Sequence, residues 1–173
     1  GCAMPVIINS GSGNQGITAS VPVIVFARDK GVSDETLHRA LALSNLVSIH
    51  IKRGIGKLSA FCGAVSAACG SGAGITWLSG GDLETVAMTV TNILANTSGI
   101  ICDGAKASCA AKVASSLDSA ILSHCMAMDR MVFKPGEGIV MGDIEDTIRS
   151  VVRIGRDGMR STDREILNIM MGC

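Results

Sequence analysis

The sequence predicts an all-α fold, a compact helical domain with buried small-residue helices and a short extended N-terminal segment. Apolar residues make up 47% of the 173 residues, whereas aromatic residues make up only 2%. A core built from Ala, Val, Ile, Leu and Met favours close helix packing over an aromatic-rich β-sandwich. After residue 9, no alternating polar and apolar run is long enough to indicate a strand.

Start and stop signals give the boundaries of the expected helices. Residues 4–9 are expected as an extended lead-in or a short strand that meets a glycine-rich turn at 10–16. Because Pro22 fits only near a first turn, the first helix should begin around Ser20 and end before Gly31. The later helices are expected at 34–53 after the N-cap Ser33, at 58–79 with a possible break near 70–74, at 83–96 after Asp82, at 109–130 after Ser108, at 143–155, and at 161–170 after Ser161 or Thr162.

These elements fall into one domain, residues 1–173, without a linker that would divide it. The segment Ser59–Leu78 is long enough to suggest a membrane span, but it is dominated by Gly, Ala and Ser, which contribute little transfer free energy. We therefore expect a buried helix and no membrane partner. Fifteen basic and fifteen acidic residues cancel, and no clustered basic surface indicates nucleic-acid binding.

The cysteine content indicates reduced thiols. Seven cysteines cannot all pair with one another within one chain, and most of them lie in Ala- and Ser-rich helical sequence rather than in a disulfide framework. No secretory signal pattern is present. We therefore expect a cytoplasmic protein, because thiols stay reduced there.

The glycine-rich turn contains Gly11–Gly16, which matches the dinucleotide pattern G-x-G-x-x-G. That fingerprint requires a second parallel strand that presents an acidic residue, whereas here Asp34 and Glu35 open a helix. We therefore reject nucleotide binding. Backbone N–H groups with Ser and Asn side chains before a helix suit an anion, such as a substrate carboxylate. The alternative is a plain turn that needs its glycines for positive φ.

Cysteines carry the strongest chemical signal. Cys102 and Cys109 flank a break between two helices, and Cys62 lies in the small-residue helix. Thiolates are soft ligands that select zinc, copper(I) or iron–sulfur clusters, and three of them leave one metal position open. The alternatives are a structural zinc site or three buried core residues, since no C-x-x-C motif is present. Cys69 and Cys125 are expected to pack in the core.

Three motifs occur in order along the chain: NSGSGNQG, SAFCGAV and CDGAKASCAAK. Together they resemble the serine dehydratase α-chain family, specifically its L-cysteine desulfidase-like branch. The resemblance implies a [4Fe–4S] cluster held by Cys62, Cys102 and Cys109. It also implies β-elimination from a small L-amino acid, which converts L-cysteine to pyruvate, ammonia and sulfide, or L-serine to pyruvate and ammonia.

The resemblance also assigns the remaining site and the partners. Enzymes of the family carry a long N-terminal part with the general base, so this chain is expected to be a portion of a longer lyase that does not turn over alone. A C-terminal cysteine returns to the active site in some relatives, which suggests Cys173. A homodimer is one possible assembly. The substrate-binding residues are expected to be Ser10, Gly11, Ser12, Gly13, Asn14, Gln15 and Lys106.

A second class of function competes with this lyase. The chain would then be a non-catalytic helical module that binds an anionic metabolite through its glycine-rich loop. In that case the cysteines are inert packing residues. Substitution of Cys109 by Ala separates the two hypotheses, because a packing residue costs only stability whereas a ligand is required for cluster uptake.

Overall fold

The structure, a computed structural model, describes residues 4–57 and 59–172 of the chain. Within these ranges it contains α-helices, one π-helical turn and no strand, which confirms the all-α prediction. The elements are α1 (Gly13–Asp29), α2 (Asp34–Ile55), α3 (Gly63–Leu78), α4 (Leu83–Thr97), α5 (Cys109–Met128), α6 (Ile144–Arg153), the π-helix η1 (Ile154–Gly158) and α7 (Arg160–Met171).

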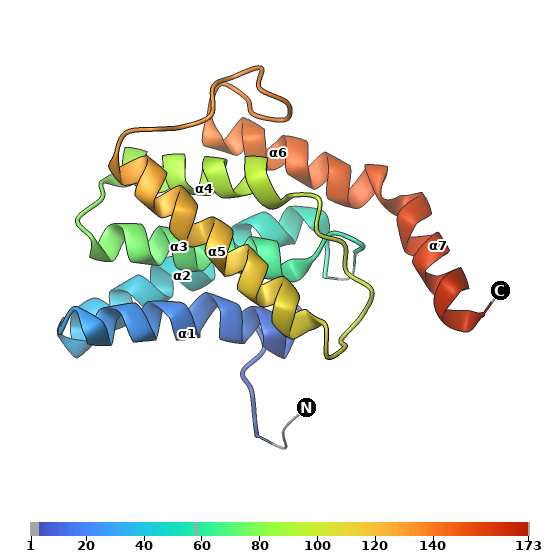
Figure 1. Cartoon of the computed structure of the whole chain (residues 1–173), viewed down its shortest axis with the longest axis horizontal. Coiled ribbons are helices and arrows are strands. Elements are labelled where there is room, and N and C mark those ends of the chain that lie inside the picture. The colour runs from blue at the N-terminus through green and yellow to red at the C-terminus, as the bar shows by residue number, and fades with distance from the viewer. Residues whose placement is uncertain (1–3, 58, 173) are drawn as a thin grey trace.

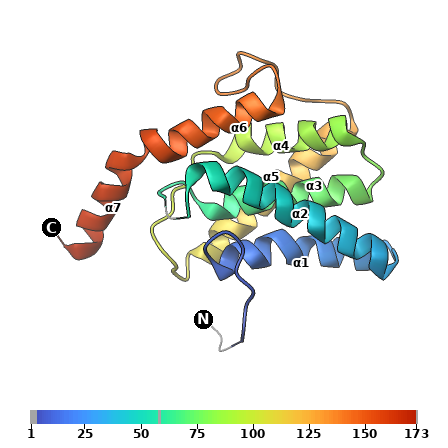
Figure 2. The same ribbon diagram turned by 180° about the vertical axis from the view of Figure 1, so that it is seen from behind.

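Helix α3 is the centre of the fold. Helices α1, α2, α4 and α5 all pack against it, while α6 lies on α2 and α4. Figures 1 and 2 show this bundle from opposite sides, with α7 extending away from it at one end. None of the described helices is both long and apolar enough to cross a membrane.

Small residues let the surrounding helices approach α3 closely. Every residue from Gly63 to Thr76 is buried, which confirms the buried small-residue helix. A Cβ atom added to Gly70 would lie 2.2 Å from the Ser44 carbonyl oxygen, so α2 packs directly on the backbone of α3. The helix is continuous through Gly70–Gly74, and the break considered there does not occur.

The first helix begins earlier than the sequence predicts. It starts at Gly13 rather than near Ser20, and Pro22 lies inside it. Ser12 is the N-cap, because its hydroxyl oxygen accepts a hydrogen bond from the Gln15 N–H at 3.3 Å. The packing of α1 along α3 outweighs the helix hydrogen bond that proline cannot donate.

The predicted N-caps Ser33 and Asp82 are confirmed, because each accepts a backbone N–H from the first turn of α2 and α4. Asp143, expected as the first residue of its helix, is the N-cap of α6 and accepts the Asp146 N–H. The last helix differs, because α7 begins at Arg160 after Met159, so neither Ser161 nor Thr162 is its N-cap.

The π-helix η1 follows α6 and was not predicted. Its Gly155 packs tightly, since an added Cβ would lie 3.0 Å from Ile55 and 3.1 Å from Phe61. The Ser59 hydroxyl also donates to the Gly155 carbonyl at 2.8 Å. These contacts attach the π-helical turn η1 to the segment that leads into α3.

Candidate functional site

The segments before α3 and before α5 meet in a short antiparallel bridge between Phe61 and Ile101. The Cys62 N–H donates to the Ile100 carbonyl at 3.0 Å, and the Cys102 N–H donates to the Ala60 carbonyl at 2.6 Å. Successive residues of an extended segment face opposite sides. Cys62 and Cys102 each follow a bridged residue, so their side chains share one face and the two thiols lie together.

The two thiols of this pair have very different pKa values. A hydrogen bond from the Cys62 thiol, assisted by the Gly104 N–H and by the charges of Lys52 and Lys112, lowers the pKa of Cys102 to about 6. The same hydrogen bond, together with burial, raises the pKa of Cys62. At neutral pH the pair therefore holds one thiolate and one thiol.

Lys52 is a functional candidate that the sequence interpretation missed. Its side chain in the last turns of α2 is only 3% exposed, and its ammonium donates to the Phe61 carbonyl at 3.5 Å. Burial lowers the pKa of Lys52, while the neighbouring Cys102 and Cys62 oppose this shift. Its place one turn after the buried Ser48 was the available signal, because it puts the lysine on the inward face of α2.

Cys109 lies outside the thiol pair. It is the first residue of α5, where its sulfur accepts from the Lys106 N–H at 3.4 Å and contacts the Gly104 carbonyl at 3.5 Å. Lys106 itself is exposed on this loop. Nearby, Lys112 donates to Asp103, and this bond raises the pKa of Lys112 and lowers the pKa of Asp103.

The structure brings together two of the three predicted cluster ligands. Cys62 and Cys102 adjoin, while Cys109 stands at the other end of the loop that begins after Cys102. In the described part of the chain, no three His, Cys, Asp or Glu side chains converge closely enough to hold a metal ion. Two soft thiol donors, one of them ionised, nevertheless fit the ligation of a thiophilic metal group.

The remaining cysteines divide between core and surface. Cys69 is fully buried in α3, as predicted, and burial raises its pKa. Cys125 is exposed on α5, so the prediction that it packs in the core is wrong. It follows the half-buried His124 and therefore points away from α3. Cys173 lies outside the described residues.

The predicted anion loop is shorter than expected. Residues 13–16 form the first turn of α1, so only Asn9–Ser12 makes a tight turn. Gly11 has φ 136°, and a Cβ there would lie 3.1 Å from the Lys57 carbonyl. Asn9 anchors the turn on α2, because its amide donates to the Asn45 side chain at 2.7 Å. The turn is therefore anchored on α2 and leads directly into the N-terminus of α1.

Gln15 connects this turn to the thiol pair. Its side-chain amide donates to Ser12 at 3.2 Å and lies against Gly63, where an added Cβ would be 2.4 Å from the amide carbon. Gln15 is 4% exposed, and its carbonyl oxygen has no hydrogen-bond partner in the described structure. Since Gly63 follows Cys62, the N-termini of α1 and α3 meet at one polar position.

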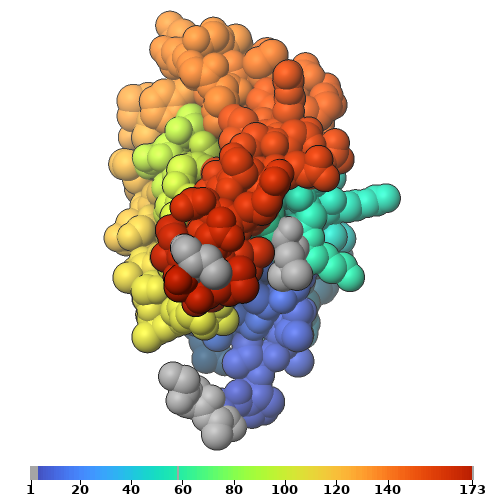
Figure 3. Space-filling model, turned by 90° about the vertical axis from the view of Figure 1, so that its right-hand side faces the viewer, coloured from blue at the N-terminus to red at the C-terminus, as the bar shows by residue number. Residues whose placement is uncertain are grey.

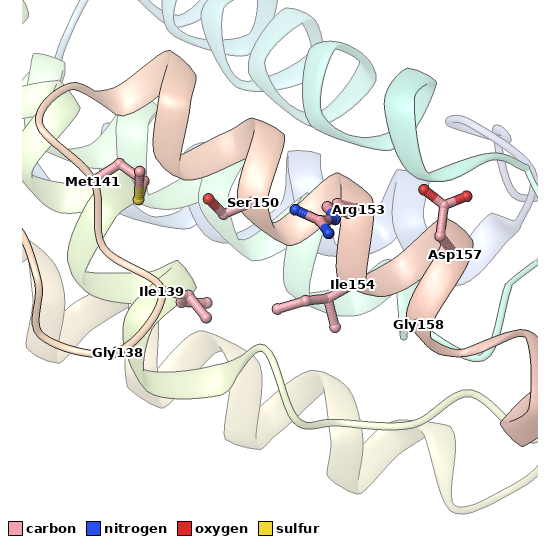
Figure 4. A pocket seen from close by; sticks show the side chains of 8 residues that line it. All are labelled: Gly138, Ile139, Met141, Ser150, Arg153, Ile154, Asp157 and Gly158. Atoms are coloured by element: carbon pink, nitrogen blue, oxygen red, sulfur yellow. The ribbon is translucent and has the colours of Figure 1, made fainter.

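A groove lies elsewhere on the molecule. It has a volume of about 580 Å³ and runs between the loop at 138–141 and the α6–η1 segment (Figure 4). Ile139 and Ile154 provide apolar lining, and Arg153 and Asp157 add charge. None of the predicted site residues lines this groove. The candidate site is thus defined by the thiol pair and the α1 N-terminus.

The fold and these groups define a helical domain with a pair of thiols, one buried and one half-buried, near a polar helix N-terminus. The family model for the serine dehydratase alpha chain matches residues 1–168. The chain belongs to the serine dehydratase α-chain family.

Curated relatives carry the name UPF0597 protein. The relative from Desulfitobacterium hafniense is 53% identical over 171 residues, which cover 99% of this chain and 40% of the relative. The relative from Treponema denticola is 54% identical, again over 99% of this chain and 40% of its own length. The chain thus spans about two fifths of the curated relatives it matches. No solved structure matches it significantly.

Proposed function

We propose that this chain is the [4Fe–4S]-bearing part of a lyase that eliminates the β-substituent of a small L-amino acid. The substrate is L-cysteine, which gives pyruvate, ammonia and sulfide, or L-serine, which gives pyruvate and ammonia. One observation supports the proposal above all. A thiol pair, Cys62 and Cys102, with one member ionised, lies near the Gln15 and Ser12 end of α1 in a member of the serine dehydratase α-chain family.

Cys62, Cys102 and Cys109 would hold the cluster. When bound through only three thiolates, such a cluster supplies an open iron position that acts as a Lewis acid toward the leaving group. The thiol pair provides two of these ligands, and Lys112 lies within electrostatic reach of Cys62 and Cys109. A positive charge there favours the thiolate forms that metal ligation requires.

The chain's own polar groups would orient the substrate. The free N–H groups at the start of α1, with the Ser12 hydroxyl, suit the α-carboxylate. The unpartnered Gln15 carbonyl oxygen can accept a hydrogen bond from the α-ammonium. Ser10, Asn14 and Lys106 complete the proposed binding set. Two contacts of opposite sign fix the orientation of an amino acid.

The proton-transfer step needs a group from outside this chain. A base removes the α-proton, the C–S or C–O bond to the β-carbon breaks, and the electron pair leaves with the sulfur or oxygen. The resulting enamine tautomerises and hydrolyses to pyruvate and ammonia. We place the base in the N-terminal part of the longer polypeptide, which is the expected partner, and we place the enzyme in the cytoplasm.

A chimera tests the proposal. This chain replaces the matching 171 residues of the Desulfitobacterium hafniense relative, and the protein is reconstituted anaerobically with iron and sulfide. We expect bound iron and sulfide, charge-transfer absorbance, and pyruvate from L-cysteine or L-serine. A folded, colourless chimera with reduced thiols and no product contradicts the lyase. Retention of a carboxylate metabolite by that colourless protein would indicate the binding module instead, and bound zinc a structural metal site.

Single substitutions give a matched control. Cys109→Ala should abolish cluster uptake, whereas Cys69→Ala, which removes a buried thiol from α3, should retain it. Equal iron content in the two variants would exclude Cys109 as a ligand. Thermal unfolding of both apoproteins shows whether either variant is misfolded.

A further inference from the structure

Lys52 carries a buried charge that no carboxylate in the described part of the chain balances. The side chain is 3% exposed, and its only hydrogen bond in the described structure is a long one, 3.5 Å, to the Phe61 carbonyl. Within residues 4–57 and 59–172, no carboxylate lies within ion-pair distance of this ammonium. Lys112, in contrast, is paired with Asp103.

A buried ammonium with one neutral acceptor is costly. Removal of an ion from water costs several kcal/mol unless an opposite charge and further hydrogen bonds compensate it. Lysine in the last turn of a helix normally extends its ammonium into solvent, as exposure of the adjacent Arg53 illustrates. The inward direction of Lys52 therefore favours negative charge at the thiol pair, where Cys102 supplies one thiolate.

The nearest anionic groups identify where that charge lies. Cys102 and Cys62 act on Lys52 most strongly, followed by Asp163 of α7. The Phe61 carbonyl, which accepts from Lys52, belongs to the residue before Cys62 and to the bridge that pairs the two cysteine segments. The ammonium thus lies next to the backbone that sets the position of the first thiol.

We propose that Lys52 is a positioning residue whose ammonium balances the negative charge of a thiolate-bound cluster and holds the Phe61–Cys62 backbone in its binding position. This inference rests on the proposed function. A [4Fe–4S]²⁺ core bound by three thiolates is anionic, and a cation buried beside two of its ligands stabilises it because little water screens the attraction. Lys52 contacts no reacting atom in this role.

Lys52→Met tests the inference in the 173-residue chain. Methionine keeps the length and apolar stem of the side chain but removes its charge. Because a desolvated charge without a carboxylate partner is lost, we expect the apoprotein of this variant to melt at the wild-type temperature or above it. After anaerobic reconstitution, its iron and sulfide content should fall severalfold. The midpoint potential of any remaining cluster should become more negative, because reduction adds negative charge beside a missing cation.

Two further variants control for charge and fold. Arg53→Met removes one positive charge from the adjacent exposed position and should change neither iron content nor potential. Lys52→Arg should restore much of the iron content, because it returns the cation. A Lys52→Met apoprotein that is less stable than wild type, or that loads and holds iron equally well, shows that Lys52 is structural and overturns the inference. Wild-type protein that takes up no cluster instead contradicts the proposed function, whatever the variants do.

Discussion

Helices α3 and α7 differ strongly in how deeply their residues are buried. Every residue of α3 from Gly63 to Thr76 is buried under four other helices, whereas α7 buries none of its residues and packs mainly on η1. Yet both adjoin the segments that carry the cysteines. Cys62 is the N-cap of α3, and Met170 of α7 lies 4.0 Å from a Cβ added to Gly104 in the cysteine loop.

This difference in burial indicates different roles for the two helices. A thiol on the most deeply packed helix has a fixed position, because any shift of α3 disturbs its contacts on all sides. Helix α7 crosses the face between the segments near residues 50–60 and 100–110, as Figure 3 shows, without a buried anchor. Local unfolding costs least where few contacts are buried. The first helix therefore holds the Cys62 end of the site in place, and we expect the second to cover the cysteine loop.

The largest expected effect comes from disturbing α3. Gly70→Ala places a Cβ 2.2 Å from the Ser44 carbonyl oxygen, which belongs to rigid helix backbone. We expect a loss of about 3 kcal/mol or more in the free energy of unfolding, because α2 and α3 must separate. Urea denaturation followed by circular dichroism measures it. Gly99→Ala is the control, since a Cβ there meets nothing within 4 Å, and equal losses in both variants would contradict close packing at Gly70.

A second test measures how Cys62, the N-cap of α3, affects the pKa and alkylation rate of Cys102. Because the hydrogen bond from Cys62 lowers the pKa of Cys102 to about 6, this thiol is mostly ionised at pH 7. Cys62→Ala should raise that pKa toward its usual range and slow alkylation of Cys102 by about tenfold. Peptide mapping of iodoacetamide-treated, metal-free protein between pH 5 and 9 measures the rate.

The pH dependence of Cys102 alkylation shows the direction of the pKa shift. Wild-type reactivity should rise through pH 6 and then level off, whereas the Cys62→Ala profile should still rise above pH 8. Cys69→Ala should leave the wild-type profile unchanged, because Cys69 is sealed inside α3. A Cys102 profile that does not respond to Cys62→Ala would show that the two thiols do not interact.

The smallest effect is expected at α7. Deletion of residues 160–173 removes no buried side chain among those described. The free energy of unfolding should therefore change by only about 0.5 kcal/mol. The same urea titration measures it, and a loss that matches Gly70→Ala would place α7 in the cooperative core instead. Faster alkylation of Cys102 in the shortened chain would support the covering role of this helix.

The helices were predictable because their signals are local. Ser33, Asp82 and Asp143 each identify a helix start through one side chain and a backbone N–H three residues later. The earlier start of α1 was not predictable from Pro22, because tertiary packing against α3 overrides a local preference. Among the candidate site residues, the sequence pointed to Cys62, Cys102 and Gln15, which the structure brings near one another, whereas Lys52 was missed.

The sequence by itself determined an all-helical chain, a small-residue helix that must be buried, and which cysteines are candidates for soft-ligand chemistry. Only the tertiary structure decided that Cys62 meets Cys102 and that Lys52 turns inward beside them. The physical reason is the distance along the chain over which each signal acts. Periodicity and caps act over a few residues, but Cys62 and Cys102 are joined by a bridge whose two segments come together only when α4 and α5 pack on α3.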